Sequence, residues 1–411
     1  MVSEFNKYGG VEDVELLPEG WIKENLLQQA ELIRALLGLR QVVIPVVDSE
    51  APELLSPPSY ASDFHFIRNW NLNAVVTVAS GKPVIGLFSG ASVLLRFLYL
   101  ALLGDPSMLR GMEDVWRLRE CASSASQRTV PSGGALRDEH LLRANWRLLA
   151  RPIDSKSIER LTLWLMADGI AEPRRDLAQS LWMQATAFLM FHEVGHIVMG
   201  HFDYMKTRRG TISLAEFGEK WPGIRSSDPF VKHAFELEAD RFAIAKMFEG
   251  FFARDKEQKV RLSAPGFIAM TQMSQQSRYR LWFTTMGVLF LLLEAHRQRA
   301  SSPGASLMQL FTLPSHPTPA FRLKHLREFT WQRFIGNDAR AKSDFESAFP
   351  DALADLRVVA QRLALWKPFA GMARSNGWYE QRMSRARAQI ADEMLAFMNS
   401  VEQRYQFRSP N

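Results

Sequence analysis

The sequence contains almost no cysteine. Cys121 is the single cysteine among 411 residues, which excludes an internal disulfide and any multi-cysteine metal site. Such low cysteine usage is typical of a reducing compartment. The first twenty residues lack the basic n-region and the apolar h-region of a signal peptide, so we expect a cytoplasmic protein.

A large excess of one charge sign is also missing. Fifty basic and 44 acidic side chains give a net charge of +6, and the basic residues are scattered, whereas a nucleic-acid binder concentrates them in a patch. The clusters at Arg208-Arg209 and at Arg382, Arg385 and Arg387 are interpreted as solvated helix and loop faces. No nucleic-acid partner is therefore expected.

Long apolar runs are absent as well. Residues 281–293 are apolar except for Thr284 and Thr285, but this run is shorter than the ~20 residues that a bilayer-spanning helix requires. Residues 88–104 form a longer run that carries Arg96 near its middle. Both segments are predicted to be buried helices, and no membrane span is expected.

The composition that remains is that of a globular protein. Apolar residues make up 47% and charged residues 23% of the chain, with 27 Phe and 11 Trp available for a core. Most of the chain shows helical periodicity. Helices are predicted near residues 21–39, 138–150, 155–169, 176–199, 230–249, 278–299, 318–328, 343–365 and 378–405, and from about residue 91.

Strand patterns are concentrated before residue 90. Residues 41–47 form a β-rich run with a proline, and residues 73–78 and 84–88 form a hairpin around a Gly-Lys-Pro turn. The predicted fold class is therefore α+β, mainly α-helical, with a small sheet near the N-terminus. We expect three regions: residues 1–137 with the sheet, residues 138–335 as a helical core, and residues 336–411 as a C-terminal helical extension.

The strongest chemical signal is the segment HEVGH at residues 192–196. Inside a helix, His192 and His196 stand on one face because they are four residues apart. Glu193 lies about 100° round the helix from His192, close enough to act on a metal-bound water without being a ligand. This arrangement supplies two zinc ligands and a general base.

The alternative is a pair of histidines on an ordinary amphipathic helix. The flanking residues 188–191 and 197–199 are strongly apolar, so two histidines and a glutamate would be buried there without a partner at a high desolvation cost. A chance HExxH would occur in roughly 1% of such chains. We therefore predict one Zn2+ per chain, bound in part by these two histidines.

A catalytic zinc needs a third protein ligand. Glu236 and Asp240 lie one turn apart in the predicted helix around residues 230–249. We expect Glu236 to bind the metal and Asp240 to accept a hydrogen bond from a ligand histidine, which fixes its orientation. The small side chains of Ala239 and Ala243 would allow close packing of the two helices.

Three other residues compete for the role of third ligand. Glu238 lies in the same predicted helix but points elsewhere. His201 would extend the local order to HEVGHxxxxH, but Gly200 should end the helix before it. His233 lies one turn before Glu236 and could line the site or face solvent.

The segment LPSHPTPAFRL at residues 313–323 carries a second candidate element. Thr318 is a suitable N-cap with Pro319 at the first helical position, which places His316 on a rigid loop just outside a helix. Peptide hydrolysis builds negative charge on the carbonyl oxygen, and a donor aimed at it is catalytic. His316 and Arg322 are the predicted donors.

Together these motifs resemble the gluzincin metallopeptidases. HEVGH followed by ELEAD matches their ligand pattern, and SHPTPAFRL resembles the His-Pro…Arg element of the group that contains the CAAX-prenyl and heat-shock endopeptidases. The segment NAVVTVASGKPVIGLFSGASVLL also resembles the strand and Gly-rich turn of that group. The resemblance runs in order from about residue 73 to 326 and implies a zincin-like core.

Among soluble relatives the chain resembles the Lit-type phage-exclusion peptidases, which are bacterial and intracellular. The resemblance implies a zinc endopeptidase for one or a few protein targets, with a role in phage defence. It also implies that an extended peptide substrate pairs with an edge strand at residues 73–78, with Asn73, Ala74, Val75 and Val76 as the contacting residues. The oligomeric state stays open.

Two other functions remain possible from the sequence. One is a zinc-stabilised protein that binds a partner peptide without cutting it, although the intact Glu193 argues against this. The other is a regulatory peptidase that cleaves helix-turn-helix repressors, which the SHPTPAFRL element and the long helical tail disfavour. The polar loop at residues 203–228 is expected to cover the cleft between the two zinc-binding helices.

Overall fold

The architecture is taken from a computed structural model and is described for part of the chain. The described segments are residues 21–37, 42–44, 53–55, 63–69, 72–79, 82–105, 108–112, 146–150, 172–201, 213–215, 229–252, 273–300, 317–336 and 338–365, with short pieces at residues 5–6, 10–12, 14, 204, 381–382 and 385–386.

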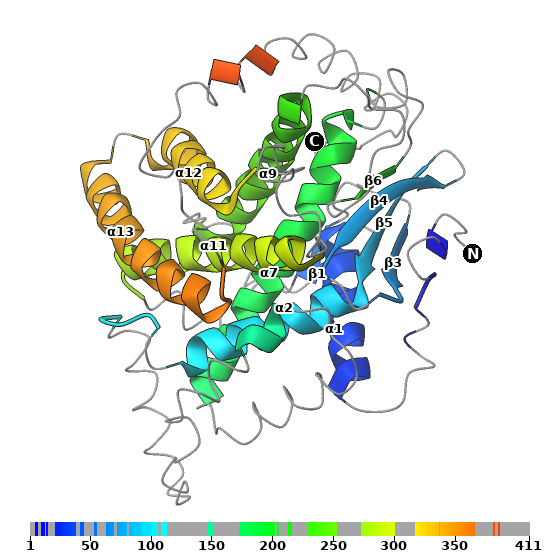
Figure 1. Ribbon diagram of the computed structural model, residues 1–411, viewed down its shortest axis with the longest axis horizontal. Coiled ribbons are helices and arrows are strands. Elements are labelled where there is room, and N and C mark those ends of the chain that lie inside the picture. The colour runs from blue at the N-terminus through cyan, green and yellow to red at the C-terminus, as the bar shows by residue number, and fades with distance from the viewer. Residues whose placement is uncertain are drawn as a thin grey trace, which may run out of the picture.

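A four-stranded sheet lies at one side of the molecule, to the right in Figure 1. Its order is β3-β5-β4-β6, in which β5 pairs parallel with β3 and antiparallel with β4. The predicted hairpin is confirmed as β4 and β5. The strands are β3 (Asp63–Ile67), β4 (Ala74–Ala79), β5 (Lys82–Phe88) and β6 (Ser213–Ala215).

The position of β4 in the sheet differs from the expectation. β6 pairs antiparallel with β4 between residues 213–215 and 75–77, so the prediction that residues 73–78 form an edge strand is wrong. The far edge at β3 is covered, because Glu12 N–H donates to Phe66 O (2.8 Å) and Arg68 N–H donates to Gly10 O (2.9 Å). Within the described sheet, β6 is the edge strand that has no further strand on its outer side.

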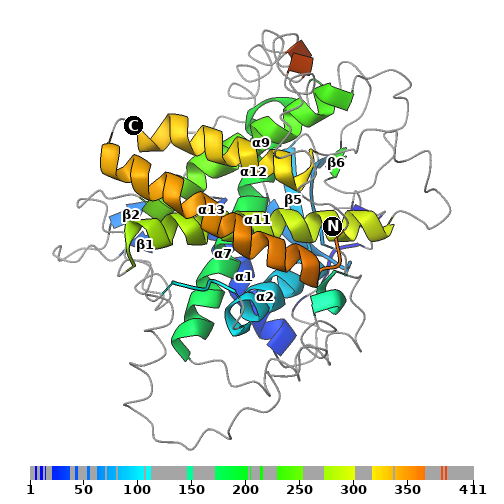
Figure 2. The ribbon, with the colours of Figure 1, turned by 60° about the vertical axis from the view of Figure 1, so that its left-hand side comes forward.

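Helices occupy the other side of the molecule, and α7 runs between them and the sheet (Figure 1). It packs against α2 and α9, while α11 packs against α12 and α13 (Figure 2). The helices are α1 (Trp21–Leu36), α2 (Ser89–Gly104), α7 (Glu172–Val198), α9 (Pro229–Phe252), α11 (Gln275–Ala300), α12 (Pro319–Thr330) and α13 (Ala339–Arg362). The mainly helical α+β class is confirmed.

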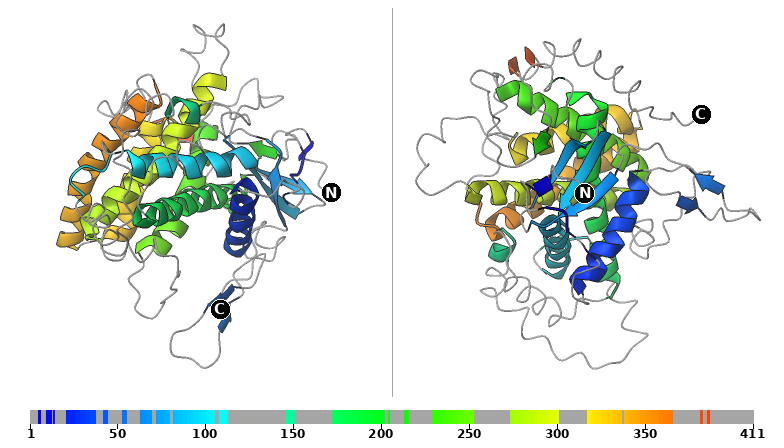
Figure 3. Two further views of the ribbon diagram at one scale, coloured as in Figure 1. Left: turned by 90° about the horizontal axis from the view of Figure 1, so that it is seen from below. Right: turned by 90° about the vertical axis from the view of Figure 1, so that its right-hand side faces the viewer.

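Several boundaries differ from the predictions. α7 begins at Glu172, and α12 continues into a π-helical turn, η4 (Trp331–Ile335). β1 (Val42–Ile44) lies in the predicted β-rich run 41–47 and pairs with β2 (Glu53–Leu55), where no strand was predicted. This pair lies apart from the main sheet in Figure 3. The helix predicted at 155–169 and most of that at 378–405 lie outside the described residues. The division into three regions stays a prediction.

The apolar runs are buried helices, as expected. All of residues 281–293 in α11 are buried, and Thr285 supplies the backbone oxygen that accepts from the Tyr99 hydroxyl of α2 (2.9 Å). In α2 the Arg96 guanidinium lies over the Trp182 ring, 5.3 Å from its centroid. Among the described helices, none is long and apolar enough to cross a membrane.

Candidate metal centre

The helix that carries HEVGH ends where the sequence predicts and begins earlier. Gly200 has φ of +72°, the left-handed conformation that ends a helix, and its N–H donates to Ile197 O (3.0 Å). Asp176, at the first position of the predicted helix 176–199, lies inside the first turns of α7, where its backbone oxygen accepts from the Ser180 hydroxyl (3.1 Å).

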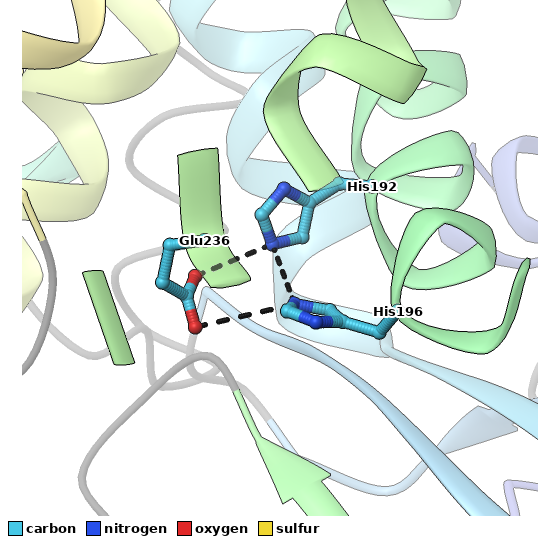
Figure 4. Close-up of side chains that lie close together, drawn as sticks. All are labelled: His192, His196 and Glu236. Carbon is cyan, nitrogen blue, oxygen red and sulfur yellow. Dashed lines mark hydrogen bonds and ion pairs between the residues drawn. The ribbon is translucent and has the colours of Figure 1, made fainter. Parts of the chain in front are cut away.

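Both histidines of HEVGH are buried on one face of α7. His192 is 0% and His196 3% exposed, and their Nε2 atoms lie 3.1 Å apart. Glu193, the predicted general base, is buried next to them at 2% exposure. The helix therefore presents two imidazole nitrogens to a single point, as Figure 4 shows.

Glu236 of α9 faces the same point from the neighbouring helix (Figure 4). Its Oε2 lies 3.4 Å from His192 Nε2, and its Oε1 lies 4.0 Å from His196 Nε2. Among the described residues these three form the one His/Cys/Asp/Glu group that could hold a metal, with ligand atoms all within 4.8 Å. The sequence-predicted ligand set is thus brought together.

The two helices approach closely because small residues face each other. A Cβ added to Gly195 would lie 3.1 Å from Ala239 O and 2.9 Å from Ala239 Cα, and the second distance is shorter than Cβ atoms adopt. Glycine at position 195 and alanine at 239 therefore allow the contact that sets Glu236 opposite His192 and His196. Ala239 was expected in this role from the sequence, and Gly195 is its partner.

Asp240 and Arg322 extend the site behind His192. Asp240 Oδ1 lies 2.9 Å from His192 Nδ1. Arg322 of α12 donates to both carboxylate oxygens, from Nε to Oδ2 (2.8 Å) and from Nη2 to Oδ1 (2.6 Å), and its guanidinium lies 4.3 Å from the centroid of the Phe290 ring. Asp240 is placed as the sequence predicts, whereas Arg322, the expected carbonyl-oxygen donor, is directed at Asp240.

This environment keeps Asp240 ionised. Burial alone would raise the pKa of the Asp240 carboxyl, but the charge of Arg322 and the hydrogen bond with His192 outweigh burial and lower the pKa to about 2. An ionised carboxylate is an acceptor only, so His192 must carry its ring hydrogen on Nδ1. The Nε2 lone pair of His192 then faces His196 and Glu236.

A different partner lies behind His196. His201 Nδ1 is 2.7 Å from His196 Nδ1, and the His201 ring stacks on Phe235 with centroids 4.5 Å apart. Burial, followed by the neighbouring His192, lowers the pKa of His196 to about 3, and burial likewise lowers the pKa of His201 well below its usual value. Both rings are therefore neutral near pH 7.

The donor set fits a zinc ion. Ligands at the tetrahedral corners of a zinc site, with bonds of ~2.0–2.1 Å, lie about 3.3 Å from one another, close to the 3.1 Å between the two Nε2 atoms and the 3.4 Å between His192 Nε2 and Glu236 Oε2. Two neutral imidazoles and one carboxylate are also the donors that catalytic zinc prefers. The carboxylate and both Nε2 atoms meet in a buried space, where a cation would balance the negative charge.

The remaining candidates lie away from this point. Glu238 accepts from Arg241 Nη1 (3.3 Å), and His233 is buried in α9 but outside the ligand group. Asn73, Ala74, Val75 and Val76 are buried around the start of β4. The predicted donor His316 and most of the loop 203–228 lie outside the described residues.

Two contacts between α9 and α12 were not anticipated from the sequence. Next to the Asp240–Arg322 pair, Arg241 Nε donates to His325 Nε2 (2.9 Å), and the Arg241 guanidinium lies 5.5 Å from the centroid of the Phe329 ring. The Asp240–Arg322 and Arg241–His325 contacts therefore hold α12 against α9. The one sequence signal for it was the i, i+3 spacing of two basic residues at the start of a capped helix.

Comparison with known protein families identifies a match over the part of the chain that contains the candidate metal ligands. The family described as Peptidase U49 matches residues 146–304, which include α7, α9 and α11 and thus His192, His196 and Glu236. The match covers less than half of the chain and indicates that the protein is a peptidase. No curated protein and no solved structure matches the chain significantly.

Proposed function

We propose that this protein is a zinc-dependent endopeptidase with His192, His196 and Glu236 as the metal ligands. The observation that supports it most is the convergence of three buried ligand atoms, from two helices held together at Gly195 and Ala239, within 4.8 Å. The peptidase match over residues 146–304 supports the reaction class. Zinc is favoured over magnesium or calcium because two of the three donors are imidazoles.

Zinc, when bound, would polarise the scissile carbonyl and make the attacking water more acidic. Glu193 follows His192 directly on α7 and is buried at the same site, which suits a general base that accepts a proton from that water and returns it to the leaving amine. Asp240 holds the His192 ring by its Nδ1–H, and Arg322 holds Asp240. His316 remains our candidate for a donor to the carbonyl oxygen.

Substrate binding follows from the sheet. An extended peptide gains backbone hydrogen bonds by adding to an edge strand, and β6 lies at the described edge. Because β6 pairs with residues 75–77, we propose that the peptide adds to the outer side of residues 213–215. The predicted substrate-binding residues Asn73, Ala74, Val75 and Val76 would then act through β6, which Val75 and Val76 pair with on its inner side. β4, to which β6 is paired, packs against α7, so such a peptide would lie near the helix that carries His192 and His196.

The biological role is proposed from the resemblance to the Lit-type peptidases: cleavage of one or a few bacterial proteins in the cell during phage attack. The alternatives are a zinc-stabilised peptide-binding protein and a repressor-cleaving regulatory peptidase. The buried Glu193 beside the ligand histidines favours cleavage over binding alone. The contact with Asp240 brings Arg322 of the SHPTPAFRL element to the site, which favours the Lit-like function over the repressor-cleaving one.

Replacement of Glu193 tests the mechanism. Glu193→Gln keeps the shape of the side chain but removes the base, so turnover should fall by about 10²–10⁴-fold while one zinc per chain is retained. New protein N-termini in cells that express either form, with and without phage, measure turnover and identify the substrate. The inactive variant should also bind the intact substrate protein without cleaving it. Crosslinks between this substrate and residues 213–215 would locate the strand to which the peptide adds.

Glu238→Gln is the matched control. Glu238 lies on α9 close in sequence to Glu236 but is paired with Arg241, so its zinc content and turnover should stay within about threefold of wild type. Equal cleavage by Glu193→Gln and wild type would refute the mechanism. Zinc binding without any new N-terminus would favour the peptide-binding protein, and cleavage confined to repressors without phage would favour the regulatory peptidase.

A further inference from the structure

His201 is buried beside the candidate metal centre without belonging to the ligand group. It follows Gly200, stacks on Phe235 at the residue before Glu236, and faces His196 with Nδ1 to Nδ1 at 2.7 Å. Two ring nitrogens at this distance share one hydrogen, so one ring donates and the other accepts. Which ring donates depends on what the Nε2 atom of His196 must do.

Without a cation, the contacts favour one direction of donation. His192 carries its hydrogen on Nδ1, which donates to Asp240, so its Nε2 is an acceptor. His196 Nε2 lies 3.1 Å from that acceptor and should donate to it. His196 Nδ1 must then accept from His201 Nδ1–H, which gives a continuous series of donors from His201 through His196 and His192 to Asp240.

With a cation, the direction must reverse at His196. A metal ligand must offer a lone pair, so His196 Nε2 cannot carry a hydrogen, and the hydrogen of that ring lies on Nδ1. His201 Nδ1 then accepts, and its own hydrogen lies on Nε2. That atom has no hydrogen-bond partner among the described residues, whereas a hydrogen on Nδ1 is donated to His196 Nδ1 in the other tautomer.

We infer that His201 is a positioning residue that exchanges tautomers with His196 when the metal binds; this inference rests on the proposed zinc site. His196 loses its Nε2 hydrogen and gains one on Nδ1, while His201 loses its Nδ1 hydrogen and gains one on Nε2. Solvent water carries the exchanged protons. The pair begins and ends with two ring hydrogens, so its net charge is unchanged.

This role explains why a histidine, and not a carboxylate, lies behind His196. Asp240 can only accept, so it fixes His192 in one tautomer with or without metal. A neutral imidazole can either donate or accept. His201 therefore allows His196 to be hydrogen-bonded on both nitrogens in the metal-free protein and to release Nε2 for the metal.

Nitrogen NMR of the ¹⁵N-histidine-labelled full chain tests the inference directly, because protonated and unprotonated ring nitrogens have different shifts. In the metal-free protein we expect His196 protonated on Nε2 and His201 on Nδ1. After one equivalent of zinc, we expect both assignments to reverse while His192 stays protonated on Nδ1. Spectra of His201→Asn, which lacks the His201 signals, assign the pair.

Two variants separate hydrogen bonding from packing. His201→Phe keeps an aromatic ring against Phe235 but removes the polar partner, so zinc affinity, measured by competition with a chromophoric chelator, should fall by about 10–100-fold. His201→Asn loses the stacking but keeps a group that can donate or accept near the position of Nδ1. Its zinc affinity should stay within about threefold to tenfold of wild type and above that of His201→Phe.

The inference is overturned if His201 has the same tautomer with and without zinc, or if His201→Asn binds zinc as weakly as His201→Phe. If either variant does not fold, the wild-type spectra still decide. A failure of the proposed function looks different: the wild type would not bind zinc at His192 and His196. Even then, a metal-free His201 protonated on Nε2 would refute the inference.

Discussion

Behind His192 the candidate metal centre is charged, whereas behind His196 it is neutral and aromatic. His192 is held by Asp240 and, through it, by Arg322, which lies 82 residues further along the chain on α12. His196 is held by His201, five residues away, and by the stacking of that ring on Phe235. The first support is assembled from distant segments and the second is largely local.

The difference has an energetic consequence. Asp240 and Arg322 are 1% and 5% exposed, so each ion depends on the other for compensation of its lost hydration. His196 and His201 are neutral, so their pairing involves no buried charge. The His192 side should therefore be sensitive to the loss of one partner, and the His196 side to acid.

The largest expected effect is the loss of one buried ion. Asp240→Leu would remove the carboxylate that pairs with the buried Arg322 and should lower the free energy of unfolding of the metal-free protein by about 3–5 kcal/mol. Chemical denaturation of both proteins, prepared without metal, measures this. A loss below about 1 kcal/mol would mean that solvent or another group compensates Arg322.

The double variant Asp240→Leu/Arg322→Met separates stability from metal binding. With both ions replaced by apolar side chains, most of the lost stability should return, because neither charge is left buried alone. Zinc affinity should remain about 10–100-fold below wild type, since the carboxylate that accepts from His192 Nδ1–H is then missing. Wild-type zinc affinity in the double variant would show that Asp240 has no orienting role.

Acid should act on the opposite side of the site. The pKa of His196 is lowered to about 3 from 6.5, so as the pH falls the unfolded chain binds a proton before the folded protein does. The contribution of His196 to the free energy of unfolding is therefore full above pH 6.5 and is lost progressively as the pH drops towards 3. His201 acts in the same direction. The pKa of Asp240 is lowered to about 2 from 3.8, so its contribution is lost only below pH 3.8.

At pH 5 the His196 side should therefore respond alone. Protonation of His196 in the unfolded chain should lower the free energy of unfolding of the metal-free protein by about 2 kcal/mol relative to neutral pH. Urea denaturation of wild type and His196→Phe at pH 7 and pH 5 isolates this contribution, which the variant should lack. The same loss of stability in both proteins would assign the acid sensitivity to other groups.

The ligand set could be predicted from the sequence because it depends on helical periodicity. His192 and His196 share a face of α7 through their i, i+4 spacing, as Glu236 and Asp240 do on α9. Once His192, His196 and Glu236 are assigned to one metal, Asp240 is expected behind a ligand histidine because it lies one helical turn after Glu236. The fold class followed in the same way from long, strongly periodic segments.

The sheet edge and the partner of Arg322 could not be predicted. β6 has three residues with no strand pattern of their own, and it pairs with residues 75–77 far away in the sequence. Arg322 was recognised as a functional candidate, but a helix start shows only that a basic side chain is available there and not which acid it meets. Both depend on tertiary packing, which leaves no local periodic signal.

The smallest expected effect tests whether the support of His192 through α12 is independent of the support of His196 by His201. Thr318 caps α12: its hydroxyl accepts from Phe321 N–H (3.3 Å), and its carbonyl accepts from Arg322 N–H (2.9 Å). Thr318→Ala should lower the free energy of unfolding by about 1 kcal/mol, and Thr318→Ser, which keeps the hydroxyl, should not. Because the cap supports Arg322 and not His201, the ring-nitrogen shifts of His192 should change while those of His196 and His201 stay as in wild type. Equal changes at all three histidines would show that the two supports are coupled through the helix bundle.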